Sequence, residues 1–237
     1  WPLMALWAEY NDAATQATAL AALVAGQLAE AITTKGRATL AVPGGTTPAL
    51  FLRILSEAAI DWSKVQVMLT DERMVPETSA RSNTNLLRAT LLQNAAAAAH
   101  LVPLYSDPAM SEGTAETLQS GIRRALPIDV CVLGMGADMH TASLFPGADR
   151  LNEALDPDCD DVLIPMQIAG TPEPRVTLTA RVLRAAPYLH LLLVGAEKLA
   201  ALKQAERPGP VALAPVRVIL TAPGQLTVHY TETAETT

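Results

Sequence analysis

The hydrophobic positions of the chain fall into short, mostly apolar runs separated by longer segments of mixed polarity. The clearest run covers residues 128–133 (IDVCVL), which are apolar and rich in β-branched residues apart from one Asp, as in a strand buried on both faces of a parallel sheet. Runs of the same kind predict further strands at residues 37–42, 65–70, 101–105, 162–165, 176–178, 189–194, 216–221 and 226–229.

Segments with apolar residues at helical spacing lie between these runs. The longest covers residues 11–34 and predicts an amphipathic helix whose apolar stripe consists of Leu20, Leu23, Val24, Leu28 and Ile32. Further helices are predicted at residues 49–59, 84–92, 111–125 and 180–185, and around Lys198. Strands that alternate with helices imply an α/β fold, and we predict one doubly wound domain over residues 1–237 with a mainly parallel sheet flanked by helices.

Composition and charge limit what the chain can bind. The 237 residues are 50% hydrophobic and 17% charged, which is enough apolar material for one large core. The net charge of −7 argues against nucleic acid and anionic membranes as partners. An anionic small molecule must therefore be held by a few Arg or Lys residues placed at its site.

The expected location is the cytoplasm. The apolar runs are shorter than a membrane span, and residues 1–10 lack the basic region and apolar core of a secretory signal. Cys131 and Cys159 are the only cysteines, and they lack the Cys-x-x-Cys spacing of a zinc site or the pattern of a disulfide framework. We expect no metal or cofactor, a small-molecule substrate, and a monomer or weak homodimer.

The segment after residues 128–133 carries the strongest candidate chemistry. Gly134 and Gly136 allow a tight turn beyond the carboxyl end of a strand, where open α/β sheets bind their ligands. Asp138 and His140 follow, and a histidine exchanges protons near neutrality because its ordinary pKa is about 6.5. A single histidine is usually structural, but the nearby carboxylate and the glycines favour a catalytic one. We interpret the remaining histidines, which have no partner at ligand spacing, as structural: His100, His190 and His229.

Two other predicted strand ends also carry polar residues. Residues 44–48 (GGTTP) combine a glycine turn with a helix start, in which we expect Thr47 as the N-cap and Pro48 as the first helical residue. Free backbone N–H groups at such a start favour an anion. Asp71, Glu72 and Arg73 follow a predicted buried strand directly, which favours a functional role over a solvated surface turn.

Several enzyme classes lack their signatures in this chain. The spacing Gly134-x-Gly136-x-x-Met139 lacks the third glycine of a dinucleotide-binding motif and lies in the middle of the chain, so nicotinamide binding is not predicted. The sequence contains neither Gly-x-Ser-x-Gly nor His-Glu-x-x-His, so a serine or zinc hydrolase has no support.

Five motifs, taken in order, resemble those of the 6-phosphogluconolactonases. They are GGTTP at 44–48, TDERMVP at 70–76 followed by SN at 82–83, GMGADMHTASLFPG at 134–147, PRVTLT at 174–179 and GAEK at 195–198. The resemblance covers most of the chain, and the ordered set is highly specific. It implies a fold shared with glucosamine-6-phosphate deaminases and related sugar-phosphate isomerases, and metal-free hydrolysis of 6-phospho-D-glucono-1,5-lactone to 6-phosphogluconate.

The resemblance, together with the chemistry of a lactone, suggests a role for each candidate residue. Hydrolysis requires a water that is deprotonated as it attacks, a stabilised oxyanion and a departing ring oxygen. We assign the general base to His140. Either Asp138 or Asp71 is expected to hold the imidazole, and Arg73 to lie near the reacting carbonyl or the phosphate. The groups expected to bind the phosphate are the backbone and hydroxyls of Gly44, Gly45, Thr46 and Thr47 and the charges of Arg175 and Lys198.

One residue departs from the family pattern. A glycine usually stands between the Asp and the His, where this chain has Met139. If the backbone there has a positive φ, the methionine is held at a cost on the order of 1 kcal/mol. The geometry of this loop is therefore an open question for the structure.

Two alternative functions remain open from sequence. One is an aldose–ketose isomerase and deaminase on the same fold. In deaminases, as the resemblance implies, an acid follows the histidine and an aromatic residue replaces the Arg of the charged triplet, whereas residues 141–146 (TASLFP) hold no carboxylate. The other is a non-catalytic sugar-phosphate sensor, which would keep the phosphate loop but lose the base, and the presence of Asp138 and His140 argues against it.

Overall fold

The computed structural model describes residues 5–107 and 112–234, which build a central sheet of seven strands. All neighbouring strands in this sheet run parallel, as the alternation of strands and helices predicts. The strands, in order across the sheet, are β1 (Leu6–Tyr10), β10 (Gln225–Thr231), β9 (Tyr188–Val194), β6 (Val130–Leu133), β2 (Ala38–Val42), β3 (Val65–Leu69) and β5 (His100–Leu101).

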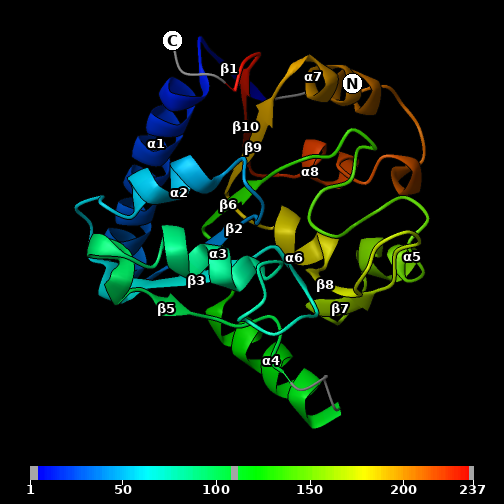
Figure 1. The fold of residues 1–237 in the computed structure, drawn as a ribbon, viewed down its shortest axis with the longest axis horizontal. Coiled ribbons are helices and arrows are strands. Elements are labelled where there is room, and N and C mark those ends of the chain that lie inside the picture. Colours follow the sequence, from blue (N-terminus) through cyan, green and yellow to red (C-terminus); the bar gives the residue numbers. More distant parts are fainter. Residues whose placement is uncertain (1–4, 108–111, 235–237) are drawn as a thin grey trace.

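A second, smaller sheet is antiparallel and was not predicted. It consists of β4 (Asp71–Arg73), β8 (Arg175–Leu178) and β7 (Leu163–Met166) in that order. The charged triplet 71–73, for which no secondary structure was predicted, is therefore a short strand, and Arg73 lies directly opposite Arg175. Figure 1 shows β7 and β8 on the far side of the central strands from α1.

Helices surround the central sheet (Figure 1). They are α1 (Ala13–Lys35), α2 (Ala49–Leu55), α3 (Asn83–Thr90), α4 (Glu112–Ala125), α5 (Leu151–Leu155), α6 (Ala180–Arg184), α7 (Ala196–Ala205) and α8 (Arg217–Leu220), with 3-10 turns at η1 (Trp62–Lys64), η2 (Asn94–Ala98) and η3 (Val211–Leu213). The strand predicted at residues 216–221 was wrong, because this segment contains α8. The sequence also gave no sign of β1, which occupies one edge of the sheet and has β10 as its single partner.

Helix α1 packs against the sheet through part of its predicted stripe. Leu20, Val24 and Leu28 are fully buried, whereas Leu23 is 41% exposed and does not belong to the buried face. By length and composition alone α1 is apolar enough to cross a membrane, which corrects the expectation that no segment is long enough. Its contacts with β2, β6 and β10 identify it instead as a helix that covers the core.

A chain of buried hydrogen bonds accounts for two of the histidines interpreted as structural. His190 Nε2 lies 2.7 Å from Gln27 Oε1, His229 Nε2 lies 2.9 Å from His190 Nδ1, and the hydroxyl of Tyr10 lies 2.8 Å from His229 Nδ1. Because Gln27 Oε1 can only accept, both neutral rings donate in the same direction and the Tyr10 hydroxyl donates to His229. Burial, reinforced by His229, lowers the pKa of His190 to about 3, and burial lowers the pKa of His229 to about 4.

The central sheet reverses its strand order between β2 and β6. From β2 the chain continues to β3 and β5 on one side, and from β6 it continues to β9 and β10 on the other. Every residue of β2 and β6 is buried, so both faces of the sheet are covered here. Open α/β sheets bind ligands at such a reversal, outside the carboxyl ends of the strands, and both glycine turns follow these two strands.

Candidate active site

A cleft of about 240 Å³ opens at this reversal. It is bounded by the turns after β2 and β6, by the end of β9, and by residues of the small sheet. Nine of the ten predicted site residues line it: Gly44, Gly45, Thr46, Thr47, Asp71, Arg73, His140, Arg175 and Lys198. The tenth, Asp138, contacts the side chain of His140. The structure therefore brings together residues from five separated stretches of the chain.

His140 and Asp138 form a close pair on the turn after β6. The Nδ1 atom of His140 lies 2.5 Å from Asp138 Oδ1, and the backbone N–H of His140 donates to the same oxygen at 3.1 Å. Burial alone raises the pKa of Asp138, but its hydrogen bonds with His140 outweigh this effect and the pKa is lowered overall. A carboxylate on Nδ1 fixes the tautomer in which Nε2 is free to accept a proton. The imidazole ring also stacks on Phe145, with 3.9 Å between ring centroids.

The turn that carries this pair depends on a glycine at position 136. A Cβ atom added there would lie 2.2 Å from the His140 ring and 2.6 Å from Asp138 Oδ1, so only glycine leaves room for both side chains. Met139 has φ 67°, which is the left-handed conformation suspected for the position where the family usually has glycine. Its backbone is held on both sides, because its N–H donates to Gly136 O at 2.9 Å and its carbonyl accepts from Val216 N at 3.0 Å.

The second candidate carboxylate, Asp71, has other partners. Its Oδ2 accepts from the hydroxyl of Ser143 at 2.6 Å, and its Oδ1 from the hydroxyl of Thr70 at 3.3 Å. Asp71 is 7% exposed and lines the cleft. Of the two carboxylates considered for His140, Asp138 is therefore the one in contact with the imidazole.

Glu72 holds the start of α3 in place beside the cleft. Its buried carboxylate accepts from the backbone N–H groups of Asn83 and Thr84, both at 2.8 Å, and from the Thr84 hydroxyl at 2.7 Å. The N-cap residue Ser82 accepts from Asn85 N at 3.1 Å. An anion at the first turn of a helix satisfies its free N–H groups and interacts favourably with the helix dipole. Glu72 is thus a buried helix cap rather than a group that faces the cleft.

Asn83 is a lining residue that the sequence reasoning did not single out. Its side-chain amide donates to the carbonyl of Asp71 at 3.3 Å, and its Oδ1 accepts from Arg73 at 3.3 Å. A Cβ atom on Gly44 would lie within 2.1–2.4 Å of the Asn83 side chain, so the glycine at 44 permits this close approach. The pair SN at 82–83 was part of the family resemblance, and it was the only signal available.

The turn at 44–48 differs in detail from its prediction. Helix α2 begins at Ala49, and Pro48 is its N-cap without a side-chain hydrogen bond, so the expected N-cap Thr47 was wrong. Gly45 has φ 91°, a conformation that favours glycine. Thr46 and Thr47 are exposed on the cleft wall.

Three cations face the cleft without a carboxylate partner among the described residues: Arg73, Arg175 and Lys198. The Nε atoms of Arg73 and Arg175 are buried and lack a hydrogen-bond partner in the described part of the chain. The Arg175 guanidinium lies over the Phe145 ring, 5.2 Å from its centroid. Burial lowers the pKa of Arg175 and the charge of Arg73 lowers it further, although Asp71 opposes this. Like charges directly opposite in a strand pair are unfavourable by themselves, so this arrangement favours an anion in the cleft.

Comparison with known proteins agrees with this geometry. The model of the family described as glucosamine-6-phosphate isomerases/6-phosphogluconolactonase matches residues 11–229. A 6-phosphogluconolactonase of Mesorhizobium japonicum is 46% identical over 217 residues, which cover 91% of this chain and 90% of that protein. One from Pseudomonas aeruginosa is 45% identical over 222 residues, with 93% and 92% covered.

A solved structure shares the whole architecture. The crystal structure of a 6-phosphogluconolactonase from Shewanella baltica has a TM-score of 0.91 and 32% sequence identity, and the match covers 96% of this chain and 97% of that one. The chain as a whole therefore has a fold already seen by experiment.

Proposed function

The chain belongs to the glucosamine-6-phosphate isomerase/6-phosphogluconolactonase family, and we infer from this membership that it acts as a 6-phosphogluconolactonase. It hydrolyses 6-phospho-D-glucono-1,5-lactone to 6-phospho-D-gluconate in the pentose phosphate pathway. The observation that supports this reaction best is the His140–Asp138 pair beside a cleft whose three cations have no carboxylate partner among the residues that the structure describes. The pair offers a base for the attacking water, and the cations offer a site for the phosphate and for the oxyanion that forms.

We propose that His140 is the general base, with Asp138 orienting its ring. Nε2 removes a proton from a water as the water oxygen attacks the lactone carbonyl carbon. The resulting alkoxide collapses, the bond from this carbon to the ring oxygen breaks, and the ring oxygen takes up the proton held on Nε2. The carboxylate at Nδ1 stabilises the imidazolium formed between these steps, at a hydrogen-bond distance of 2.5 Å.

We propose that the cations divide the negative charge of the substrate between them. Arg73 NH1 is already held by the carbonyl of Arg81 at 2.9 Å, which fixes the guanidinium at the cleft wall. This position suits Arg73 to stabilise either the alkoxide or the phosphate. Arg175 and Lys198, with the Gly44–Thr47 turn, would hold the 6-phosphate, because rigid guanidinium groups and exposed backbone N–H groups both suit a phosphate.

The alternative functions have less support from the geometry. A deaminase-type isomerase would place an acid after the histidine, where the chain instead has Phe145 stacked on the ring. A sensor without catalysis would have no use for a carboxylate aimed at Nδ1 of a histidine in the cleft. No contact among the described residues of the cleft favours either alternative over the lactonase.

We further propose a cytoplasmic enzyme without metal or cofactor, acting as one domain and as a monomer or weak homodimer. The two sheets are joined through Thr70, whose N–H donates to Val42 O and whose carbonyl accepts from Leu178 N, both at 3.0 Å. Light scattering on the purified protein gives its mass, and calorimetry should show one cooperative transition. Two separate transitions would contradict the single domain, and loss of activity after chelation would contradict metal independence.

A coupled assay with freshly generated lactone tests the function, with the spontaneous rate in buffer subtracted. Glucosamine 6-phosphate, tested in parallel, identifies a deaminase if it is consumed. His140→Gln keeps much of the polarity but removes the base, so kcat should fall by roughly 10²–10⁴-fold while the circular dichroism spectrum is unchanged. For the wild type, kcat/KM should rise with pH through one ionisation, and this limb should vanish in the variant. A variant with near-normal kcat would rule out His140 as the base.

A further inference from the structure

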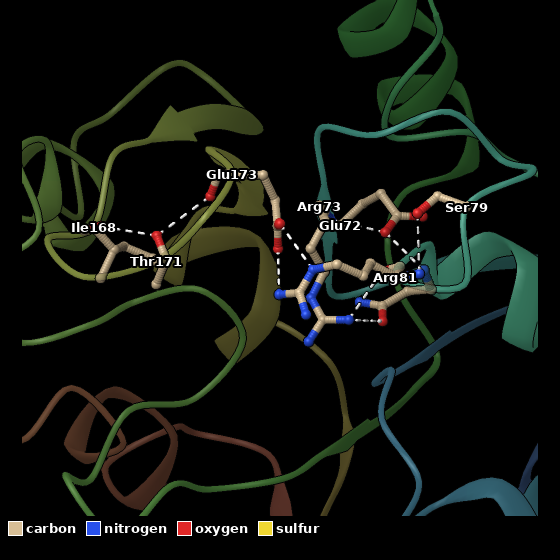
Figure 2. Close-up of polar contacts among 8 residues, drawn as sticks. Glu72, Arg73, Ser79, Arg81, Ile168, Thr171 and Glu173 are labelled. Carbon is tan, nitrogen blue, oxygen red and sulfur yellow. Dashed lines mark hydrogen bonds and ion pairs between the residues drawn. The ribbon is translucent and has the colours of Figure 1, made fainter.

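An ion pair joins the two loops that flank the arginines of the cleft. Arg81, in the loop between β4 and α3, donates to Glu173, in the turn before β8, through Nε to Oε2 at 2.8 Å and through NH2 to Oε1 at 2.6 Å. Figure 2 shows the carboxylate of Glu173 directed at Arg81, with Arg73 beside it. The side chain of Glu173 is 10% exposed and that of Arg81 is 49% exposed, so a nearly buried carboxylate is paired with a partner at the surface.

The pair lies next to the two arginines opposite each other in the small sheet. Arg73 donates to the carbonyl of Arg81, and Glu173 precedes Arg175 by two residues. The turn is fixed locally, because Met74 N donates to Pro174 O at 2.9 Å. The hydrogen bond from Arg81 is the largest cause that lowers the pKa of Glu173. Burial opposes it, and the charges of Arg73 and Arg175 lower the pKa further, so all three cations act on this carboxylate.

We propose that Arg81 is a positioning residue: by engaging both oxygens of Glu173, it keeps this carboxylate off Arg73 and Arg175 and leaves them free for the phosphate of the substrate. This inference rests on the proposed function, since it concerns the anion site of the same cleft. It gives Arg81 and Glu173 a role in substrate affinity although neither lines the cleft.

The physical reason is the cost of an unpaired buried charge. Without Arg81, the Glu173 carboxylate keeps its burial but loses both charge-assisted hydrogen bonds. The remaining cations that act on it are Arg73 and Arg175, whose Nε atoms are buried and have no partner in the described part of the chain. Glu173 would then satisfy these atoms itself and compete with the substrate's phosphate for the same donors.

The test compares Arg81→Ala, Glu173→Gln and the double variant with wild type. The alanine keeps the carbonyl that holds Arg73, so kcat should stay within about twofold. We expect Arg81→Ala to raise KM for the phosphorylated lactone and the inhibition constant of inorganic phosphate on the order of tenfold. KM for unphosphorylated glucono-1,5-lactone should not change. The double variant should return both constants to the values of Glu173→Gln alone, because the competing charge is gone.

A matched control is available on the surface. Arg150 forms the same two-bond geometry with Glu153, at 2.8 and 2.6 Å, away from the cleft. Arg150→Ala removes a surface ion pair of the same geometry. It should leave kcat, the KM of each lactone and the inhibition constant of phosphate unchanged. Arg81→Lys keeps one charge opposite Glu173 and should show an intermediate KM.

Two outcomes would overturn the proposal. If the double variant keeps the raised KM of Arg81→Ala, Arg81 contacts the substrate itself or shapes the loop. If Arg81→Ala lowers kcat and raises KM equally for both lactones, Arg81 acts on the stability of the fold and not on the phosphate site. Failure of the proposed function is seen separately in the wild type, which would then hydrolyse neither lactone faster than buffer.

Discussion

Gly136→Ala disturbs the position of the proposed base, His140, while leaving the histidine itself in the sequence. The added Cβ would lie 2.2 Å from Cε1 and Nδ1 of His140 and 2.6 Å from Asp138 Oδ1, and ordinary carbon contacts are about 3.5 Å or longer. The imidazole must therefore move by roughly 1 Å or lose its 2.5 Å contact with Asp138. A displacement of this size at a reacting group can cost about 10²-fold, and the lost charge-assisted hydrogen bond is worth about 1.5–3 kcal/mol. We expect kcat to fall on the order of 100-fold.

Gly134→Ala is the matched control, since a Cβ there meets no atom within 4 Å. Gly134 lines the cleft, so any effect of the added methyl should appear in KM and not in kcat. The assay is initial-rate hydrolysis over a range of lactone concentrations for both variants, with circular dichroism to check folding. If Gly136→Ala retains kcat within about threefold of wild type, the observed contact between His140 and Asp138 does not matter for the reaction.

Three further results are expected. Lys198→Ala should raise KM for the phosphorylated lactone far more than for unphosphorylated glucono-1,5-lactone, because Lys198 faces the proposed phosphate position; equal effects would refute this. Met139→Gly should leave Tm unchanged or raise it, since relief of the strain at φ 67° offsets the extra entropy of the unfolded chain, and Met139→Ala, which keeps the strain, should melt below it. His190 and His229 have pKa values of about 3 and about 4 in the fold, below the ordinary value of about 6.5, so the unfolded state binds protons first as the pH falls. The free energy of unfolding in urea should therefore decrease between about pH 6.5 and 4, by up to about 1.4 kcal/mol per pH unit for each histidine. A free energy independent of pH in this range would show that His190 and His229 are not buried in the neutral form.

The sequence predicted the parts of the fold that depend on local pattern. Residues 128–133 predicted β6 because a strand buried on both faces is apolar throughout. The glycines after it predicted a turn at the edge of the sheet. The position of His140 followed from these two facts together with the rule for open α/β sheets. The glycine that usually stands at position 139 raised the question of a left-handed backbone there, and the structure answers it with φ 67° at Met139.

Elements that depend on distant partners were out of reach. The triplet Asp71–Arg73 has no strand propensity of its own and becomes β4 because β8, about a hundred residues later, pairs with it. Residues 217–220 (RVIL) have the composition of a strand yet form α8, since so short an apolar run does not distinguish the two states. The cap formed by Glu72 on α3 likewise exists only once the loop between them has folded back.

The pairing of β4 with β8 also determines at which stage of folding the cleft forms. All of the chain from α3 to β7 lies between the two strands, including the turn that carries His140. Contacts between such distant segments form slowly, because the closure entropy of the intervening chain must be overcome first. Arg73 and Arg175 are neighbours only after this closure. A newly synthesised chain should thus acquire its helices and its first parallel strands well before it can hold an anion, and the return of activity during refolding should mark the last step of assembly.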